Sequence, residues 1–375
     1  MEELLMKIIN HRTIAGVVFA LLWLFLTFRE AEAPIFGVPR DEMRKEWLQT
    51  ADAVYAGTAF QIADGRPGKL PVGKSEINGQ WVLADFRVDD VIKGPAAEQV
   101  SVEFFRPPDT FVTPMASVPP KVRCLLFLKS ADEKQPLYRL LEPRGPTGSV
   151  IFLAPEPPLG LDKKTDAAER LSLELVNTVL NGKPGIAISA IHNLKTLEIP
   201  KEIVLPALQT VSKDKNPELM VCAIATRISI GDKTAVTEAM TLVEAGKCSE
   251  PQRQEIGDSM RDLTAPEYVD QLNQIFHSKD VFLRRGAIYA LRQSKATNAV
   301  LPILGGALQD VDTEVKYHAM MGIARRIPDG TGTPPAPAYR LFLEKPQEYL
   351  LPWLAWWDKN KDRYPGETPD AEKRN

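Results

Sequence analysis

The chain is poor in the residues that most metal sites and disulfide frameworks need. Among its 375 residues are four histidines and three cysteines, Cys124, Cys222 and Cys248. The cysteines are too few and too scattered for a disulfide framework or a zinc motif. His192, His277 and His318 also lack the short spacing that lets one helix offer two metal ligands. We therefore expect no bound metal and no cofactor.

The sequence also lacks an excess of charge and the common catalytic motifs. Its 46 basic and 49 acidic side chains leave a net charge of -3, and no global basic field attracts nucleic acid. We find no phosphate loop, no dinucleotide-binding glycine pattern, no zinc-protease His-Glu-x-x-His and no Gly-x-Ser-x-Gly. These absences favour a protein that is not an enzyme and has no nucleic-acid partner.

One apolar run stands at the start of the chain. Residues 14–28 are apolar apart from Gly16 and Thr27, with Lys7 and Arg12 before them and an Ala-x-Ala pattern at 31–33. The sequence leaves open whether residues 1–33 are a cleaved signal peptide or an uncleaved membrane anchor, since the run is slightly short for a span. Either way we expect the rest of the chain to be exported, either periplasmic or secreted.

Residues 40–153 combine one short helix with several strands separated by Gly/Pro turns. Alternating apolar residues predict strands at 53–62, 80–92, 99–105, 121–129, 137–141 and 148–153. Residues 65–73 hold Gly, Pro and Lys and are expected to form a loop. This pattern predicts a small β-barrel or sandwich.

Three segments of this region resemble a known module. They are Ala-Asp-Ala-Val-Tyr-Ala-Gly-Thr at 51–58, Asp-Phe-Arg-Val-Asp-Asp-Val-Ile-Lys-Gly at 85–94 and Cys-Leu-Leu-Phe-Leu-Lys at 124–129. Together they resemble the netrin-like module, whose family includes the tissue inhibitors of metalloproteinases. The resemblance covers about residues 45–155 and implies an OB-type β-barrel, with protease inhibition or matrix binding as an alternative function.

The chain departs from that family in one respect. The inhibitors chelate the protease zinc through an N-terminal cysteine, and no cysteine precedes Cys124 here, so that mechanism does not carry over. An OB barrel also suggests single-stranded nucleic acid, with Phe104, Phe105 and Phe111 stacking bases beside Lys93 and Arg106. Filling of the core by these strand residues is the favoured interpretation.

A proline-rich linker at 154–165 separates this region from a helical array at 166–330. The array repeats every 32 residues, since the segment from Asp280 aligns with the segment from Asp312. The spacing predicts helices at 166–180, 186–197, 202–212, 217–230, 233–245, 250–263, 266–277, 281–293, 299–308 and 313–327. The helix at 250–263 fits least well, because Glu255 stands where its neighbours have alanine or glycine.

These segments resemble HEAT repeats, in the short form found in phycobilisome-lyase-like proteins. The resemblance implies an all-α solenoid that binds a protein partner, so we expect an exported or membrane-anchored interaction scaffold. A bilin-lyase-type enzyme is a remote alternative. It would need a pigment pocket and a cytoplasmic location, and the export signal disfavours both.

Several side chains are candidates for a partner-binding surface. Arg284 and Lys316 share one repeat position, where pairing with Asp280 or Asp312 in an inter-helix turn is the favoured role. His318 lies beside Lys316 and is a candidate contact. The remaining candidates are three tryptophans on one helix face, Trp353, Trp356 and Trp357.

The end of the chain is expected to close the array. Residues 331–364 are predicted to form a cap that seals the last repeat, and residues 365–375 a disordered tail. A partner-binding aromatic patch is the other interpretation of the tryptophans. A calcium loop starting at Asp358 is disfavoured, because Arg363 and Pro369 occupy its glycine and glutamate positions.

Overall fold

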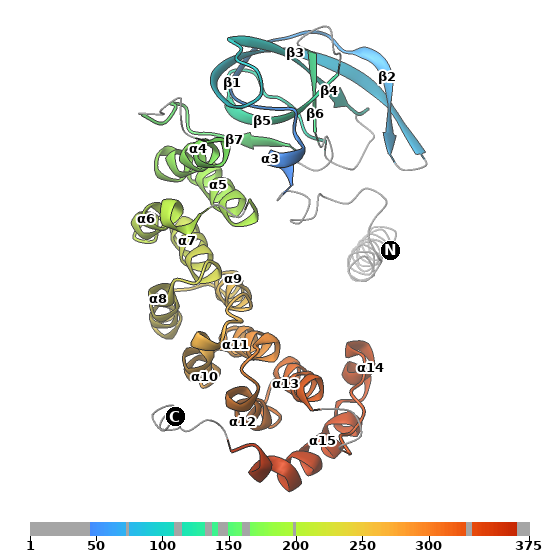
Figure 1. Ribbon diagram of the computed structural model, residues 1–375, viewed down its shortest axis with the longest axis vertical. Coiled ribbons are helices and arrows are strands. Elements are labelled where there is room, and N and C mark those ends of the chain that lie inside the picture. The colour runs from blue at the N-terminus through green and yellow to red at the C-terminus, as the bar shows by residue number, and fades with distance from the viewer. Residues whose placement is uncertain are drawn as a thin grey trace, which may run out of the picture. The chain divides into compact units, whose positions relative to one another are not determined.

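The chain divides into two compact units, residues 1–150 and 151–375, in the computed structural model (Figure 1). The structure describes residues 46–72, 75–108, 115–131, 137–141, 149–159, 166–197, 200–327 and 332–365. A sheet region is followed by helices, the coarse layout that the sequence predicts. The proposed signal or anchor segment and all of the tail after residue 365 lie outside the described residues.

The first unit is built around strands. Its elements are α3 (Trp47–Thr50), β1 (Ala53–Ile62), β2 (Arg66–Val72), β3 (Ser75–Lys93), β4 (Gln99–Arg106), β5 (Arg123–Ser130) and β6 (Leu137–Leu140), with β7 (Val150–Phe152) at the division. The loop prediction for 65–73 is wrong, because β2 pairs with the first half of the long strand β3. Among the described strands β2 pairs only with β3, and such an edge strand tolerates Pro67 and Pro71, which have no backbone N–H to donate.

The strands of the sheet curl back on one another. Strand β1 pairs antiparallel with both β3 and β5, β3 pairs with β4, and β6 joins β4 in parallel and β5 antiparallel. The two ladders of β6 have only three residue pairs each, against eight in the β3–β4 ladder. The sheet region is therefore joined by few residue pairs at β6 and falls short of a fully closed barrel.

The aromatics that could have stacked nucleic-acid bases belong to the core. Phe104 and Phe105 are buried, and the Lys93 ammonium donates to the carbonyls of Leu48 and Gln49. Phe111 lies outside the described residues. The favoured core interpretation therefore holds for the two described phenylalanines.

The second unit consists of helices in the order that the 32-residue period predicts. They are α4 (Ala167–Asn181), α5 (Pro184–Thr196), α6 (Lys201–Val211), α7 (Pro217–Ser229), α8 (Lys233–Glu244), α9 (Glu250–Met260), α10 (Val269–Phe276), α11 (Val281–Gln293), α12 (Thr297–Ala307), α13 (Thr313–Arg326), α14 (Tyr339–Glu344) and α15 (Pro346–Asn360). Short 3-10 turns at Pro266–Tyr268 and Lys361–Arg363 complete the described elements. Side chains of Asn216, Asp280 and Asp312 accept hydrogen bonds from the first free amides of their helices.

The helices stack in two rows (Figure 1). Helices α5, α7, α9, α11 and α13 contact one another in series, and we call them the α5–α13 row. Helices α4, α6, α8, α10 and α12 lie along one side of that row. The backbones of α9 and α11 approach closely where they cross. A Cβ added to Gly286 of α11 would meet the Gly257 carbonyl oxygen of α9 at 2.1 Å. No larger residue fits there without a shift of the helices.

The last two helices close the array. One continuous hydrophobic core runs from α7 to α15 and includes Trp353, Trp356 and Trp357. Trp353 is fully buried, and its indole N–H donates to the Pro335 carbonyl at 3.3 Å. Burial of all three rings favours the cap over the aromatic patch. Among the described residues, no helix combines the length and the apolar character that crossing a membrane requires.

Candidate functional site

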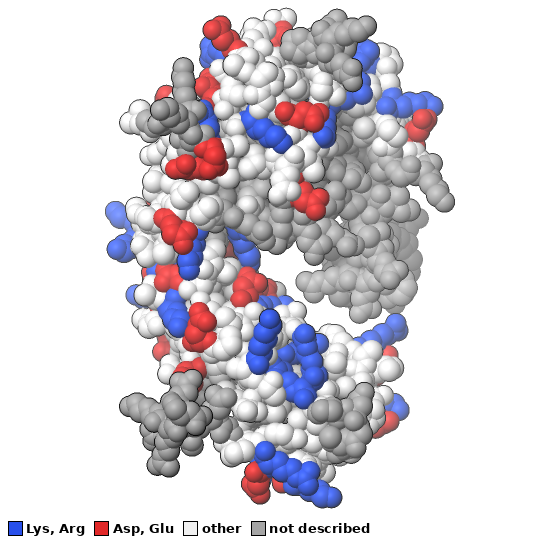
Figure 2. Space-filling view, viewed as in Figure 1, with Lys and Arg blue, Asp and Glu red and all other residues white. Residues whose placement is uncertain are grey.

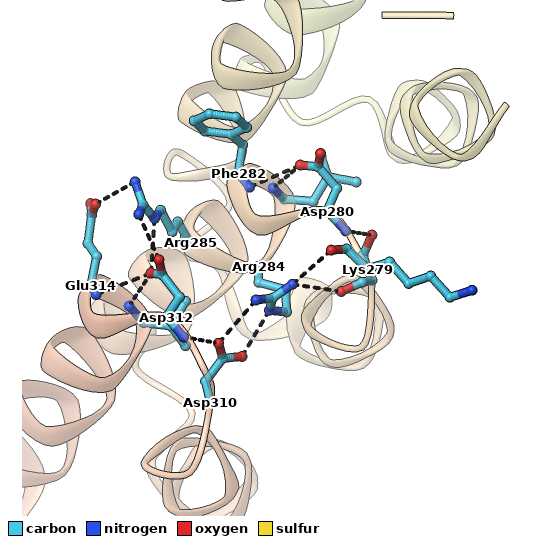
Figure 3. Close-up of polar contacts among 11 residues, drawn as sticks. Lys279, Asp280, Phe282, Arg284, Arg285, Asp310, Asp312 and Glu314 are labelled. Atoms are coloured by element: carbon cyan, nitrogen blue, oxygen red, sulfur yellow. Dashed lines mark hydrogen bonds and ion pairs between the residues drawn. The ribbon is translucent and has the colours of Figure 1, made fainter. Parts of the chain in front are cut away.

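The predicted residue Arg284 makes a buried structural pair (Figure 3). Its guanidinium binds both carboxylate oxygens of Asp310, at 2.9 and 3.1 Å, and donates to the carbonyls of Ser278 and Lys279. Only 12% of the Arg284 side chain and 7% of the Asp310 side chain are exposed. The pair ties the turn before α11 to the turn before α13. The structural pairing predicted from the repeat register is therefore observed for Arg284, with Asp310 as the acid in place of Asp280 or Asp312.

The two expected acids pair with other arginines, which form a repeating ladder. Arg253 of α9 pairs with Asp280 at 3.0 Å, and Arg285 of α11 pairs with Asp312 at 2.7 Å. Arginine and acid both recur after 32 residues, so the same bond is repeated between successive helices of the row. Burial raises the pKa of the Asp312 carboxyl, but its hydrogen bonds from Arg285 and from two backbone amides outweigh burial and lower it overall.

His318 lies in a polar cluster between α11 and α13. The Arg292 guanidinium donates to its Nδ1 at 2.8 Å, so the ring proton lies on Nε2, which is 3.7 Å from a Glu314 oxygen. The His318 ring also packs edge-on against Tyr289 at 5.0 Å. The hydrogen bond from His318 holds the pKa of the Glu314 carboxyl below its ordinary value. His318 is thus a buried imidazole with a fixed orientation and not an exposed contact.

Lys316 differs from the other predicted residues. It is half-buried on α13, and its side chain forms no hydrogen bond or ion pair within the described part of the chain. The described row also exposes Asp258 and Arg325 and half-exposes Arg261, whose guanidinium lies 5.0 Å from the Tyr289 ring. Figure 2 shows basic side chains gathered over the region of α11 and α13, below the centre of the view. These groups offer a polar surface of mixed charge.

A second group of side chains meets where α5, α7 and α9 pack together. His192, Cys222 and Glu255 come from these three helices, and their possible ligand atoms all lie within 4.8 Å of one another. The Cys222 Sγ is 3.8 Å from the His192 Nε2. Burial raises the pKa of the Cys222 thiol to about 12 and also raises that of the Glu255 carboxyl. A thiol held neutral in this way is a poor nucleophile.

A groove runs beside this group. Its volume is about 370 Å³, and its lining includes His192, Glu255, Asp258, Lys195 and Thr226. The sequence did not predict that His192, Cys222 and Glu255 meet, because helical spacing relates residues along one helix and not across three. The one signal was Glu255 itself, which interrupts the alanine position of the repeat.

The sheet region has a groove of its own. It holds about 600 Å³ and is lined in part by Trp81, Leu83 and Glu103. The buried Glu103 carboxylate forms an ion pair with the Arg139 guanidinium at 2.7 Å and a second one with Arg66. The Arg139 guanidinium lies 4.6 Å above the Trp81 ring. The ion pairs and the Trp81 ring therefore hold Arg139 and Glu103 in place beside the groove.

Comparison with protein-family models and with curated proteins gave no match. The function is therefore inferred from the arrangement of the side chains. Within its described residues, the α5–α13 row provides repeated structural ion pairs, an exposed polar strip and one compact group of possible metal ligands.

Proposed function

We propose that the chain is an exported protein-interaction scaffold and not an enzyme. In this proposal residues 1–33 direct export. They are then either cleaved off as a signal peptide or kept as a membrane anchor. Residues 166–330 are a HEAT-type solenoid whose α5–α13 row binds a protein partner, and the sheet region is an OB-type barrel of the netrin-like kind. The ring of strand pairings and the parallel β4–β6 ladder support that barrel.

The serial contact of the five helices in the α5–α13 row carries the proposal. Each helix packs on its neighbours along the row, and the Arg253–Asp280 and Arg285–Asp312 pairs repeat the same connection one step apart. Arrays of this kind expose one long face instead of enclosing a single pocket, and they use that face to bind other proteins. Asp258 and Arg325 are exposed along the row.

A capture experiment with charge-reversed variants tests the proposal. The full-length protein is expressed with an affinity tag, crosslinked in an envelope fraction and purified. Lys195→Glu with Arg325→Glu changes exposed charges of the α5–α13 row, and Lys201→Glu with Lys213→Glu changes exposed charges around α6 as a matched control. We expect one partner with the wild type and the control and a loss of it with the row variant. Equal recovery by all three proteins, or no partner at all, contradicts the proposal.

The groove beside Trp81 favours a second candidate function. A netrin-like module that inhibits a protease or binds matrix would use this face, where Arg139, Trp81 and Glu103 are held together. Titration of the full-length protein against metalloproteases tests this candidate, and we expect no inhibition. Dose-dependent inhibition that Trp81→Ala abolishes would favour the candidate over the scaffold.

A further inference from the structure

We propose that His192, Cys222 and Glu255 form a binding site for a divalent metal ion of the zinc class. The three side chains supply one nitrogen, one sulfur and one carboxylate oxygen from α5, α7 and α9. These donors are the ones that zinc prefers in proteins, whereas magnesium and calcium take oxygen donors. This inference does not rest on the proposed scaffold function.

The distances between the ligand atoms fit a tetrahedral ion if those atoms move slightly closer together. With Zn–S of about 2.3 Å and Zn–N of about 2.0–2.1 Å, two tetrahedral ligands lie roughly 3.6 Å apart. The Cys222 Sγ and the His192 Nε2 are 3.8 Å apart, and every pair of ligand atoms is within 4.8 Å. Small rotations of the Glu255 and His192 side chains would therefore complete the set.

The site has an open side. His192 is exposed and Glu255 is half-buried, and both line the groove of about 370 Å³. Three protein ligands leave one tetrahedral position, and the groove lined by His192 and Glu255 provides room for a fourth ligand beside them. A zinc site of this form keeps a water molecule that another ligand can replace. The fourth ligand would be water or a side chain of a bound partner.

The carboxylate of Glu255 departs from the pattern of the repeat. The equivalent positions 32 residues before and after it hold Ala223 and Ala287, both fully buried. Placing a carboxylate at such a position costs free energy because the charged form loses water. A divalent cation would offset that cost and would bind Cys222 as the thiolate. Hydrogen bonds among the three side chains alone are the competing explanation.

Cobalt substitution tests the site directly. The full-length protein is stripped with a chelator and titrated with Co²⁺, whose thiolate complexes absorb in the near ultraviolet. We expect one Co²⁺ per chain, a thiolate-to-cobalt band and displacement of that band by Zn²⁺ but not by Mg²⁺. The band should vanish in Cys222→Ser and persist in Cys248→Ser, which removes another buried free thiol.

Two further variants separate metal binding from folding. Glu255→Ala restores the small residue of the repeat, so the metal-free variant should melt no lower than the metal-free wild type and should lose the rise in Tm that Zn²⁺ causes. His192→Ala should weaken Co²⁺ binding by more than the roughly 10–100-fold that loss of an outer-shell partner costs, and His277→Ala should not. Absence of the band, or a band that survives Cys222→Ser, overturns the proposal.

Discussion

Single residues decide how closely the last helices approach. Gly305 of α12 lies under the Trp357 ring, and a Cβ built there would meet the ring atoms at 1.9 to 2.3 Å. We predict that Gly305→Ala lowers the free energy of unfolding by about 1–3 kcal/mol through overpacking. The adjacent Gly306 is exposed, and a Cβ added to it would meet nothing within 4 Å. Gly306→Ala should raise stability by about 0.5–1 kcal/mol, and equal effects in urea unfolding would contradict this packing.

The two residues that share one repeat position should behave differently. Arg284→Ala leaves the Asp310 carboxylate buried without its cation, which costs about 3 kcal/mol for pairs of this kind. Lys316→Ala removes a half-buried side chain that holds no such partner, and surface changes of this kind stay within about 0.5 kcal/mol. Chemical denaturation of both variants measures the difference. Similar losses in the two variants would show that Arg284 is no more structural than Lys316.

The sequence predicted residue roles where one repeat or one helix contains the whole pattern. Arg284 was assigned a structural pair from its register, but the acids named for it, Asp280 and Asp312, pair with Arg253 and Arg285 instead. The group of His192, Cys222 and Glu255 was not predicted. Its members lie on three helices, and only the packing of those helices brings them within 4.8 Å.

The helices at the end of the array cover its hydrophobic core. Trp353 of α15 is fully buried, whereas Leu351 on the same helix is 59% exposed. We predict that Trp353→Ala lowers the free energy of unfolding by about 3–5 kcal/mol and that Leu351→Ala changes it by less than about 0.5 kcal/mol. Thermal unfolding followed by circular dichroism checks both. A partner-binding patch would show the opposite result, namely lost binding with unchanged stability in Trp353→Ala.

Helices were easier to predict than strands for a physical reason. Each helix of the array carries its own 3.6-residue apolar period, and several carry an N-terminal cap such as Asn216 or Asp232. The edge strand β2 carries Pro67, Gly68 and Pro71 within seven residues and has no such signal. Its extended form depends on pairing with β3, which a local pattern does not contain.

Acid stability is a property of the whole array. The pKa of Glu314 is held below its ordinary value of 4.5 by the hydrogen bond from His318, and ion pairs and hydrogen bonds lower the pKa of Asp232 and Asp312 despite burial. Carboxyls with lowered pKa contribute stability above their ordinary pKa and lose it as the pH falls through the lowered value.

We therefore predict that the free energy of unfolding falls progressively as the pH drops below about 4.5. Denaturant titrations monitored by tryptophan fluorescence at a series of pH values between about 7 and about 3 would measure this slope. Glu314→Gln should lower stability at neutral pH and should reduce the dependence on pH in the acid range. A variant with the wild-type slope would show that Glu314 does not contribute to it.

We propose that the long face of the α5–α13 row binds a protein. Photo-crosslinking amino acids placed singly at exposed Gln254 and Arg325 of the row, and at exposed Gln209 and Thr237 of α6 and α8, test it in cells. We predict one shared adduct from the two row positions and none from the two control positions. Adducts from the control positions alone, or none from the row, would contradict the account.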